Sequence, residues 1–261
     1  MKANLSQTTF IIPVFYDSQD RISNAAVTIA YLCRHLNTNI IIYEFGRKPI
    51  TPTILADINT EGSNIEVLYE SGMGIFRRTK YINAMLKKVQ TPVVVNYDVD
   101  VILGSGDVYL NCQKKILEGV DMLYPYFQGS SQKRVDAIGR DFLFDTLDIA
   151  ALPKEALSTD YSAYGHCQFF STEAYRAGGG ENELFVAWGP EDVERYYRFT
   201  KLGYRVEYGT DCIYHLEHSR GVNSSIQNPH LRQNRKLFEY IQSLSVEKLR
   251  EYYGVKQAIL P

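Results

Sequence analysis

The chain has 261 residues, of which 45% are hydrophobic, and a formal net charge of −2. This length and apolar content suffice for one sizeable domain, and the charge balance lacks the basic footprint of nucleic-acid binding. Apolar runs such as Ile40–Ile42 are too short to cross a bilayer, and the first residues lack a signal-peptide core. The scattered cysteines fit neither a zinc site nor a disulfide framework, which favours reduced thiols in a cytoplasmic protein. They are Cys33, Cys112, Cys167 and Cys212.

The first hundred residues alternate between apolar runs and amphipathic stretches. Strands are predicted at Thr9–Phe15, Asn39–Phe45, Ile65–Tyr69 and Pro92–Tyr97. Helices are predicted at Ile22–Leu36 and Phe76–Val89, because apolar residues recur there three and four positions apart. Strand–helix alternation builds a parallel sheet with helices on both faces, so this part is expected to be a nucleotide-binding half.

The rest of the chain is less regular. Strands are predicted at Val120–Tyr126, Tyr204–Tyr208 and Cys212–Leu216, and residues 127–162 have no readable periodicity. The tail contains two expected helices, one with Pro229 at its first position and one over Val246–Tyr253. No linker divides the chain, so residues 1–261 are predicted to form a single domain. The nucleotide-binding half is expected to end at about residue 103, and the acceptor- and metal-binding half at about residue 220. The C-terminal helices are expected to begin at about residue 228.

Two carboxylates, Asp98 and Asp100, follow the apolar run Pro92–Val95. In α/β folds the C-terminal tip of such a strand is where ligands bind. Carboxylate oxygens suit Mg²⁺ or Mn²⁺, and Mg²⁺ is often held by carboxylates together with substrate phosphates. The pair favours a metal–diphosphate site, although acidic residues at strand ends also cap turns and helices without any metal.

A second acidic pair, Glu191 and Asp192, stands at a predicted helix start. The helix dipole favours negative charge in a first turn, which explains the pair without any catalytic role. However, the only tryptophan of the chain, Trp188, lies just before it. An indole beside a carboxylate can hold a sugar, and a helix start is a rigid mount for a general base. The expected buried stripe of this helix is Val193, Tyr196, Tyr197 and Thr200, with Gly203 at its end.

His215 and His218 are candidate metal ligands three residues apart. They can meet on one helical turn or point to opposite faces of a strand, so the choice between them stays open. A structural histidine between apolar neighbours explains the segment equally well. Arg77 and Arg78 can neutralise a diphosphate or orient Asp98, although adjacent arginines also begin solvated helices.

These pieces occur in one order along the chain. Pro13–Phe15 is followed by Phe76–Asn83, Asp98–Asp100, Trp188–Asp192 and Tyr214–His215. From about residue 9 to 220, the order resembles the inverting GT-A glycosyltransferases, above all the β-1,4-galactosyltransferase and chondroitin-polymerase-type transferases. Their pattern includes a Phe-Asn-Arg-Ala-Lys-type helix, an Asp-Val-Asp metal motif and a Trp-Gly-Gly-Glu-Asp-type helix start. The resemblance implies an α/β fold of the GT-A, Rossmann-like type, with a mixed sheet flanked by helices in a single domain with C-terminal helices.

The resemblance also implies roles for individual residues. Asp100 and His215 would bind Mn²⁺ (or Mg²⁺), with Asp98 touching the ribose or the metal-bound water. Asp192 would be the general base, and Glu191 its neighbour that binds the acceptor. The other implied contacts are donor contacts at Pro13, Phe15, Arg21, Glu44, Arg78 and Asp98, and acceptor contacts at Trp188, Gly189 and Glu191.

The implied activity is metal-dependent transfer of a hexose, with inversion, from a nucleotide-diphosphate sugar to a hydroxyl of a glycan or lipid-linked glycan acceptor. UDP-linked galactose and N-acetylgalactosamine are the expected donors. The chain shows no sign of the membrane anchor and disulfides of the vertebrate galactosyltransferases. It therefore resembles a bacterial cytoplasmic enzyme of surface polysaccharide synthesis, with room for peripheral membrane association. One departure is Pro190, which replaces the usual second glycine and stiffens the turn where the acceptor should approach.

Two other functions remain open. A sugar-nucleotide nucleotidyltransferase would share the sheet and the carboxylates, but it usually has a glycine-rich loop after the first strand. Here that loop, Tyr16–Arg21, contains no glycine. The second alternative is a non-catalytic sugar-binding subunit, against which the set of Asp98, Asp100, Asp192 and His215 argues.

Overall fold

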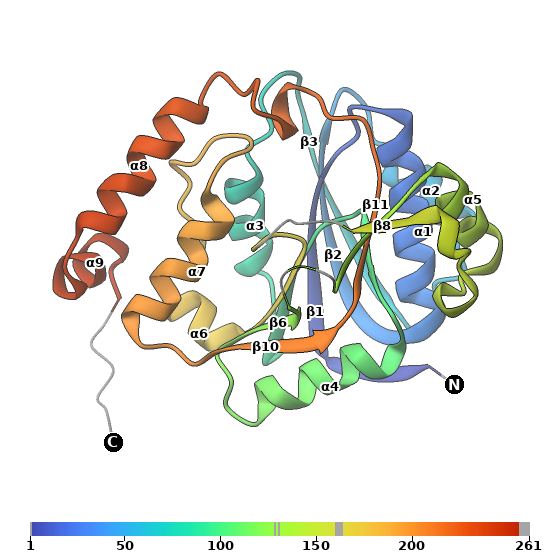
Figure 1. Ribbon diagram of the computed structural model, residues 1–261, viewed down its shortest axis with the longest axis horizontal. Coiled ribbons are helices and arrows are strands. Elements are labelled where there is room, and N and C mark those ends of the chain that lie inside the picture. Colours follow the sequence, from blue (N-terminus) through green and yellow to red (C-terminus); the bar gives the residue numbers. More distant parts are fainter. Residues whose placement is uncertain (1, 128, 130, 160–163, 256–261) are drawn as a thin grey trace.

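A seven-stranded sheet forms the centre of the protein (Figure 1). The computed structural model describes residues 2–127, 129, 131–159 and 164–255. The strands lie in the order β10 (Val206–Asp211), β6 (Met122–Tyr126), β9 (Cys167–Ser171), β4 (Val93–Tyr97), β1 (Ala3–Phe15), β2 (Leu36–Gly46) and β3 (Asn64–Ser71). Neighbours are parallel except at β9, which runs antiparallel to both β4 and β6. The sheet is therefore mixed, as expected.

The central strands are almost continuously apolar because helices cover both faces of the sheet. Phe10, Ile11 and Ile12 of β1 are fully buried, and so are residues Val93–Val95 of β4. The strands predicted in the first hundred residues are confirmed, with β1 and β2 longer than expected. As a result β1, β2 and β4 end together at one edge of the sheet, where Asp98 follows β4 directly.

A second, smaller sheet connects the two halves of the chain. Its strands lie in the order β5 (Val101–Leu103), β11 (Ile213–Leu216), β7 (Gln132–Val135) and β8 (Leu157–Thr159). The antiparallel register of β5 and β11 pairs Val101 with His215. This pairing brings the segment with both histidines beside the acidic segment that precedes β5.

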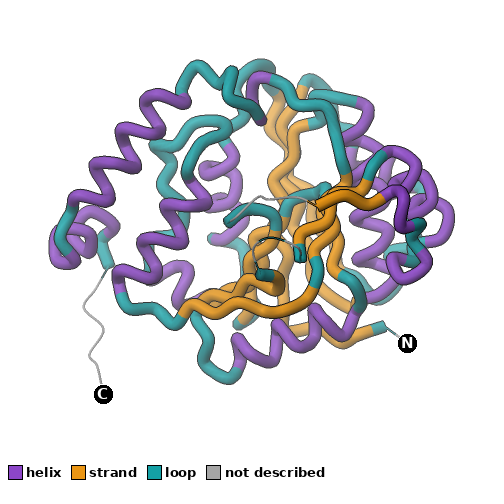
Figure 2. Tube along the Cα trace, in the orientation of Figure 1, coloured by secondary structure: helices purple, strands orange, loops and turns teal. Residues whose placement is uncertain are grey.

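Helices surround the large sheet (Figures 1 and 2). In the view of Figure 1, the helices to the right of β1 and β2 are α1 (Gln19–His35), α2 (Thr51–Ala56) and α5 (Ala137–Thr146). Those to the left are α3 (Arg78–Leu86), α6 (Thr172–Ala177), α7 (Glu191–Leu202), α8 (Leu231–Ser243) and α9 (Val246–Tyr253). Helix α4 (Gly106–Leu117) packs against β1, β6 and β9. Short 3₁₀ turns occur at Ile149–Ala151, Lys154–Ala156 and Val222–Ser224.

Two apolar clusters hold these layers together. The main core lies between the large sheet and its helices and includes the rings of Phe10, Tyr97 and Phe169. The second cluster joins α7 to the C-terminal helices through Phe185, Leu202, Ile241, Leu244 and Leu249. No described helix is both long and apolar enough to span a membrane. All four cysteines are free thiols.

Several sequence predictions about local structure need correction. The predicted stripe of α7 is wrong, because Val193, Tyr196 and Tyr197 are only half-buried and Thr200 is exposed. The buried face of α7 instead combines the apolar Phe199 and Leu202 with charged side chains such as Arg195 and Arg198, and a search for apolar periodicity cannot detect the charged ones. Helix α8 begins at Leu231, two residues after the proline predicted to open it.

Other elements lacked a readable signal. Strand β9 and the helices α2, α4 and α6 were not predicted, and each is short or lacks a continuous apolar stripe. Residues 127–162 contain β7, α5 and β8, with residues 160–163 outside the described part.

Candidate active site

A cleft opens at the edge of the sheet where β1 and β4 end. Its lining includes ten of the predicted site residues: Pro13, Phe15, Arg21, Arg78, Asp98, Asp100, Trp188, Glu191, Asp192 and His215. They come from segments far apart in the sequence and meet because parallel strands end at the same edge. Two predicted residues, Glu44 and Gly189, are not among the described lining residues.

Three residues gather at one end of the cleft in an arrangement suited to a metal ion. Asp100, His215 and His218 each offer one ligand atom, and these atoms lie within 4.8 Å of one another. Asp100 is only 4% exposed, and its Oδ2 lies 3.3 Å from Nε2 of His218. The Nδ1 of His218 donates to the carbonyl of Ser219 at 2.7 Å, which orients Nε2 toward the cluster. Both histidines left open by the sequence thus face the same carboxylate.

The electrostatics of this cluster favour an ionised carboxylate. Burial alone would raise the pKa of Asp100, but the hydrogen bond from His218 and the nearby His215 and Arg21 hold that pKa well below its usual range. Conversely, burial lowers and the Asp100 carboxylate raises the pKa of His218, with a net upward shift. Arg21, at the start of α1, contacts Asp100 at 3.3 Å and Asp17 at 2.9 Å. A cation bound here would take the place of these positive charges.

Asp98 faces the middle of the cleft. It accepts a hydrogen bond from Arg78 at 2.7 Å and one from the backbone N–H of His166 at 3.2 Å. His166 is in the left-handed region at φ 70°, a conformation costly for a residue with a side chain. Ala187, at φ 54°, is likewise left-handed and also lines the cleft. Backbone strain of this kind concentrates at functional sites, so it supports a binding role for the cleft.

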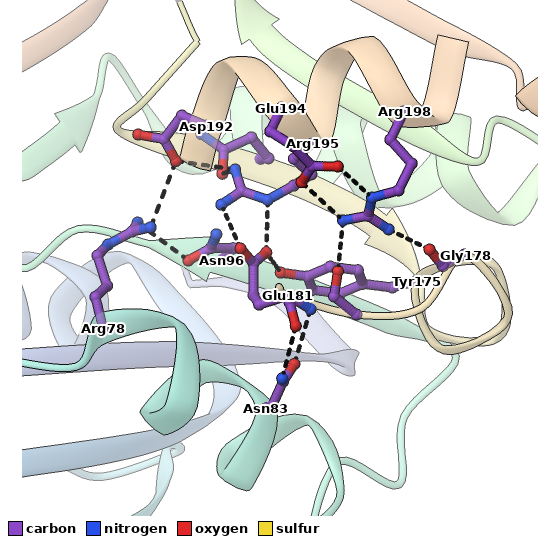
Figure 3. Close-up of polar contacts among 12 residues, drawn as sticks. Arg78, Asn83, Asn96, Tyr175, Gly178, Glu181, Asp192, Glu194, Arg195 and Arg198 are labelled. Carbon is purple, nitrogen blue, oxygen red and sulfur yellow. Dashed lines mark hydrogen bonds and ion pairs between the residues drawn. The ribbon is translucent and has the colours of Figure 1, made fainter. Parts of the chain in front are cut away.

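The guanidinium of Arg78 joins the two acidic motifs. It contacts Asp98 at 2.7 Å. Figure 3 shows its contacts with Asp192 and Asn96, each at 3.4 Å. Burial lowers the pKa of Arg78, but the carboxylates of Asp98 and Asp192 raise it. The net upward shift of this pKa keeps the guanidinium charged. The two acidic motifs, predicted separately, therefore form one connected group across the cleft.

Glu191 and Asp192 differ sharply in environment although they are neighbours. Glu191 is 4% exposed and its Oε2 has no hydrogen-bond partner among the described residues, whereas the Asp192 side chain is 24% exposed. Burial, followed by the negative charge of Asp192, raises the pKa of Glu191 to about 8. Asp192 instead contacts two arginines, Arg78 and Arg195. Two carboxyl groups with such different surroundings are suited to different tasks.

The segment before α7 is fixed from behind by two asparagines. Asn228 donates to the Trp188 carbonyl at 2.6 Å, and Asn234 donates to the Val186 carbonyl at 2.9 Å. A Cβ on Gly189 would lie 2.6 Å from Nδ2 of Asn234, so this glycine permits the close approach of α8. Gly189 therefore supports the turn from outside the cleft rather than contacting the space where an acceptor was expected.

Glu44 also has a role different from the one expected. It is fully buried, and its carboxylate accepts hydrogen bonds from the backbone N–H groups of Ile50 and Thr51 at 2.6 and 2.9 Å. These are free donors at the start of α2, so Glu44 caps that helix. The cap leaves no exposed carboxylate to bind a nucleotide base.

Further residues line the cleft. Phe76 stacks on Phe15 with ring centroids 6.0 Å apart, and Arg220 and Asn223 come from the loop after β11. Asn223 accepts from the N–H of Phe76 at 2.9 Å, which joins this loop to the start of α3. Phe76 is the first residue of the segment Phe76–Asn83 that carries the family resemblance. Asn223 lies in a polar loop with no distinguishing pattern.

Comparisons with known proteins agree with this architecture. Neither protein-family models nor curated proteins give a match. Among solved structures, the chain is similar to a mannosyltransferase from Pyrobaculum calidifontis in complex with GDP-Man and Mn²⁺, with a TM-score of 0.57 at 16% identity over 95% of this chain and 67% of that one. It is also similar to GalNAc-T7 with UDP, GalNAc and Mn²⁺, with a TM-score of 0.59 at 10% identity over 96% and 55%.

A third similar structure is the catalytic domain of Drosophila β1,4-galactosyltransferase 7, with a TM-score of 0.49 at 13% identity over 92% of this chain and 82% of that one. The chain spans about half the length of the GalNAc-T7 chain. The first two similarities show that this protein has the GT-A fold, and the predicted fold class is confirmed.

Proposed function

We propose that the protein is a metal-dependent glycosyltransferase that moves a sugar from a nucleotide-diphosphate sugar to an acceptor hydroxyl. One observation carries the proposal: the cleft combines an Asp/His/His cluster at one end with a carboxylate pair at the other. The GT-A fold supports it, as do two structural neighbours with Mn²⁺, one in complex with GDP-Man and one with UDP and GalNAc.

The proposed metal ligands are Asp100, His215 and His218. The donor set of one carboxylate and two imidazoles favours a transition ion such as Mn²⁺ over Mg²⁺, which prefers oxygen ligands. When bound, such an ion supplies charge stabilisation for a departing diphosphate. Asp98, which the sequence also put forward as a ligand, is held by Arg78 and the His166 N–H and is assigned to the donor.

The donor's nucleotide would occupy the part of the cleft near the end of β1. Phe15 and Phe76 offer ring surfaces there, and Pro13 lines the same wall. Arg21 and Arg220 both line the cleft, Arg21 in contact with Asp100. Fixed positive charges near a diphosphate stabilise the negative charge that develops as it departs.

Asp192 would act as the general base at the other end of the cleft. It accepts the proton of the acceptor hydroxyl while the acceptor oxygen forms a bond to the anomeric carbon. The bond from that carbon to the diphosphate breaks, and its electron pair leaves with the nucleoside diphosphate. A base on the face opposite the leaving group gives inversion of configuration. Trp188 would stack on the acceptor sugar, and Glu191 would bind it through a hydroxyl.

The finer features of the proposal follow the sequence resemblance. The donor is a UDP-linked galactose or N-acetylgalactosamine, and the acceptor is a glycan or lipid-linked glycan of a bacterial surface polysaccharide. The site of action would be the cytoplasm.

The test is a transfer assay with a panel of UDP- and GDP-linked sugars, with and without Mn²⁺. The expected result is Mn²⁺-dependent transfer from one donor class, with inverted anomeric configuration by NMR. His215→Ala and His218→Ala should each weaken Mn²⁺ binding measured by calorimetry, and His230→Ala, outside the cleft, serves as control. Transfer of a nucleotidyl group, or Mn²⁺-independent activity, would contradict the proposal.

A further inference from the structure

Arg195 is a fully buried arginine in the middle of α7 (Figure 3). Its Nε and Nη2 donate to the two carboxylate oxygens of Glu181 at 2.6 and 3.0 Å, which makes a bidentate ion pair. Glu181 is 4% exposed and accepts a further hydrogen bond from the hydroxyl of Tyr175. Two parallel hydrogen bonds leave the guanidinium one orientation, so its remaining nitrogen points in a fixed direction.

That remaining nitrogen, Nη1, points toward the cleft. It donates to Oδ1 of Asp192 at 3.0 Å and to the side-chain oxygen of Gln168 at 3.1 Å. Gln168 is itself held in place, because its amide nitrogen donates to the carbonyl of Tyr164 at 3.1 Å. Asp192 is therefore the one member of this group that is both in contact with Arg195 and partly exposed in the cleft.

The two carboxylate oxygens of Asp192 have different hydrogen-bond partners. Arg195 and Arg78 both contact Oδ1, at 3.0 and 3.4 Å. Among the described residues, none donates a hydrogen bond to Oδ2. A carboxylate held by one oxygen in this way presents the other oxygen to whatever enters the cleft.

Arg198, one turn further along α7, provides a built-in comparison. It is also fully buried and pairs with a carboxylate, Glu194, at 2.9 Å. It also donates hydrogen bonds to the carbonyls of Gly178 and Gly180, and Glu194 is also contacted by Tyr253. This second pair ties α7 to the loop after α6 and to α9 and has no contact with Asp192.

A buried ion pair brings little net stability compared with apolar residues of the same size, so stability alone explains neither pair. For Arg195 the contact to Asp192 supplies another reason. We propose that Arg195, locked by Glu181, is a positioning residue that holds Oδ1 of Asp192 and leaves Oδ2 as the proton-accepting oxygen. This inference rests on the proposed function, and it assigns a task to a pair that the sequence pattern did not reveal.

The charged and titratable groups around Asp192 come from three elements. Arg195 and Glu191 belong to α7, Arg78 belongs to α3, and the hydroxyls of Tyr124 and Tyr126 on β6 are near enough for Asp192 to raise their pKa values. For both tyrosines burial is the larger cause of that upward shift. Among the described residues, Arg195 and Arg78 are the cations in direct contact with Asp192, so replacing Arg195 leaves Arg78 as its cationic partner.

The experiment compares two matched double variants. Arg195→Met with Glu181→Gln removes the positioning pair without leaving a buried charge, and Arg198→Met with Glu194→Gln does the same one turn away. For the first, kcat should fall about 10–100-fold with an unchanged donor KM, because a small displacement of a catalytic group has this cost. The Arg198 pair should keep the wild-type kcat and the wild-type donor KM.

A third variant, Arg195→Lys, separates charge from geometry. It keeps the positive charge but lacks the planar fork, so kcat should fall while the donor KM stays unchanged. If the Arg195 pair variant matches the Arg198 pair in kcat, or if Arg195→Lys keeps wild-type kcat, the inference is overturned. Absence of transfer by the wild-type protein, or full activity of Asp192→Asn, would instead overturn the proposed function, so the two failures are distinguishable.

Discussion

Helices α1 and α7 both begin at the cleft, yet they differ in what they bury. Helix α1 buries Ala25, Val27, Ile29 and Leu32 against β2 and the small sheet. Helix α7 buries Phe199 and Leu202 but also Glu194, Arg195 and Arg198, whose charges pair within the protein. The first helix is held mainly by removal of apolar surface from water, whereas the second also depends on ion pairs that each need a partner in the right place.

The contrast teaches where each kind of buried surface is used. An apolar face is tolerant, because neighbouring side chains can shift to fill space. A buried ion pair is directional, so it fixes the groups attached to it. Directional contacts are found on the helix whose first turn carries Glu191 and Asp192, the proposed acceptor side of the cleft.

The largest expected effect is at the start of α7. Asp192→Asn keeps the shape of the side chain but cannot accept a proton, so transfer should fall by about 10²–10⁴-fold. Donor affinity and thermal stability should stay near wild type, because the amide can still accept a hydrogen bond from Arg195. Single-turnover rates and calorimetry measure these quantities, and near-normal turnover would remove Asp192 from its proposed role.

The next effect concerns stability on the charged face of α7. Glu194→Ala leaves the buried Arg198 without its carboxylate and should cost about 3–5 kcal/mol in the free energy of unfolding. Glu194 is 1% exposed and also accepts a hydrogen bond from the hydroxyl of Tyr253, so the cost falls on a fully buried group of charges. Urea denaturation measures the cost, and an unchanged midpoint would show that the pair contributes nothing.

On the apolar face of α1 the expected cost is slightly smaller. Leu32 is fully buried, and Leu32→Ala should destabilise the protein by about 2–5 kcal/mol through lost burial and a residual cavity. Because Leu32 lies away from the cleft, kcat measured on the folded fraction should be unchanged. A loss of kcat equal to that of the α7 variants would erase the proposed difference between the two helices.

A further expected effect is a pH dependence of stability that comes from Glu191. Its pKa in the folded protein is about 8, above the usual value of 4.5. The folded state therefore binds a proton that the unfolded state has lost between these two values, so stability is full below pH 4.5 and decreases as pH rises through 8. The slope is at most about 1.4 kcal/mol per pH unit. Glu191→Gln should remove this slope in denaturation midpoints measured from pH 5 to 9, and an unchanged slope would contradict the shift.

The same two helices show how far sequence reasoning reaches. The strands of the first hundred residues and α1 were predictable because apolar spacing dictates them. The face of α7 was not, because ion pairing depends on partners such as Glu181 that come from another segment of the chain. A local sequence pattern shows where a charged residue lies, but not which distant residue pairs with its charge.

Some residues of the candidate site could be located from local sequence, and others depend on distant parts of the chain. Asp98 and Asp100 could be located because a strand end is visible in the sequence. The position of His218 beside Asp100 depends on the pairing of β5 with β11, which no local signal encodes. Glu44 was misassigned because a buried helix cap and an exposed ligand look alike in sequence.

The pairing of β5 with β11 also has a consequence for how the protein is made. Asp100 leaves the ribosome long before His215 and His218, so a growing chain carries one candidate ligand without the others. Closing so long a loop is entropically costly and slow, and it must await the segment that follows β10. The cluster should therefore be among the last parts of the molecule to form. A partly synthesised chain would carry Asp100 without the two histidines and would therefore lack the proposed metal site.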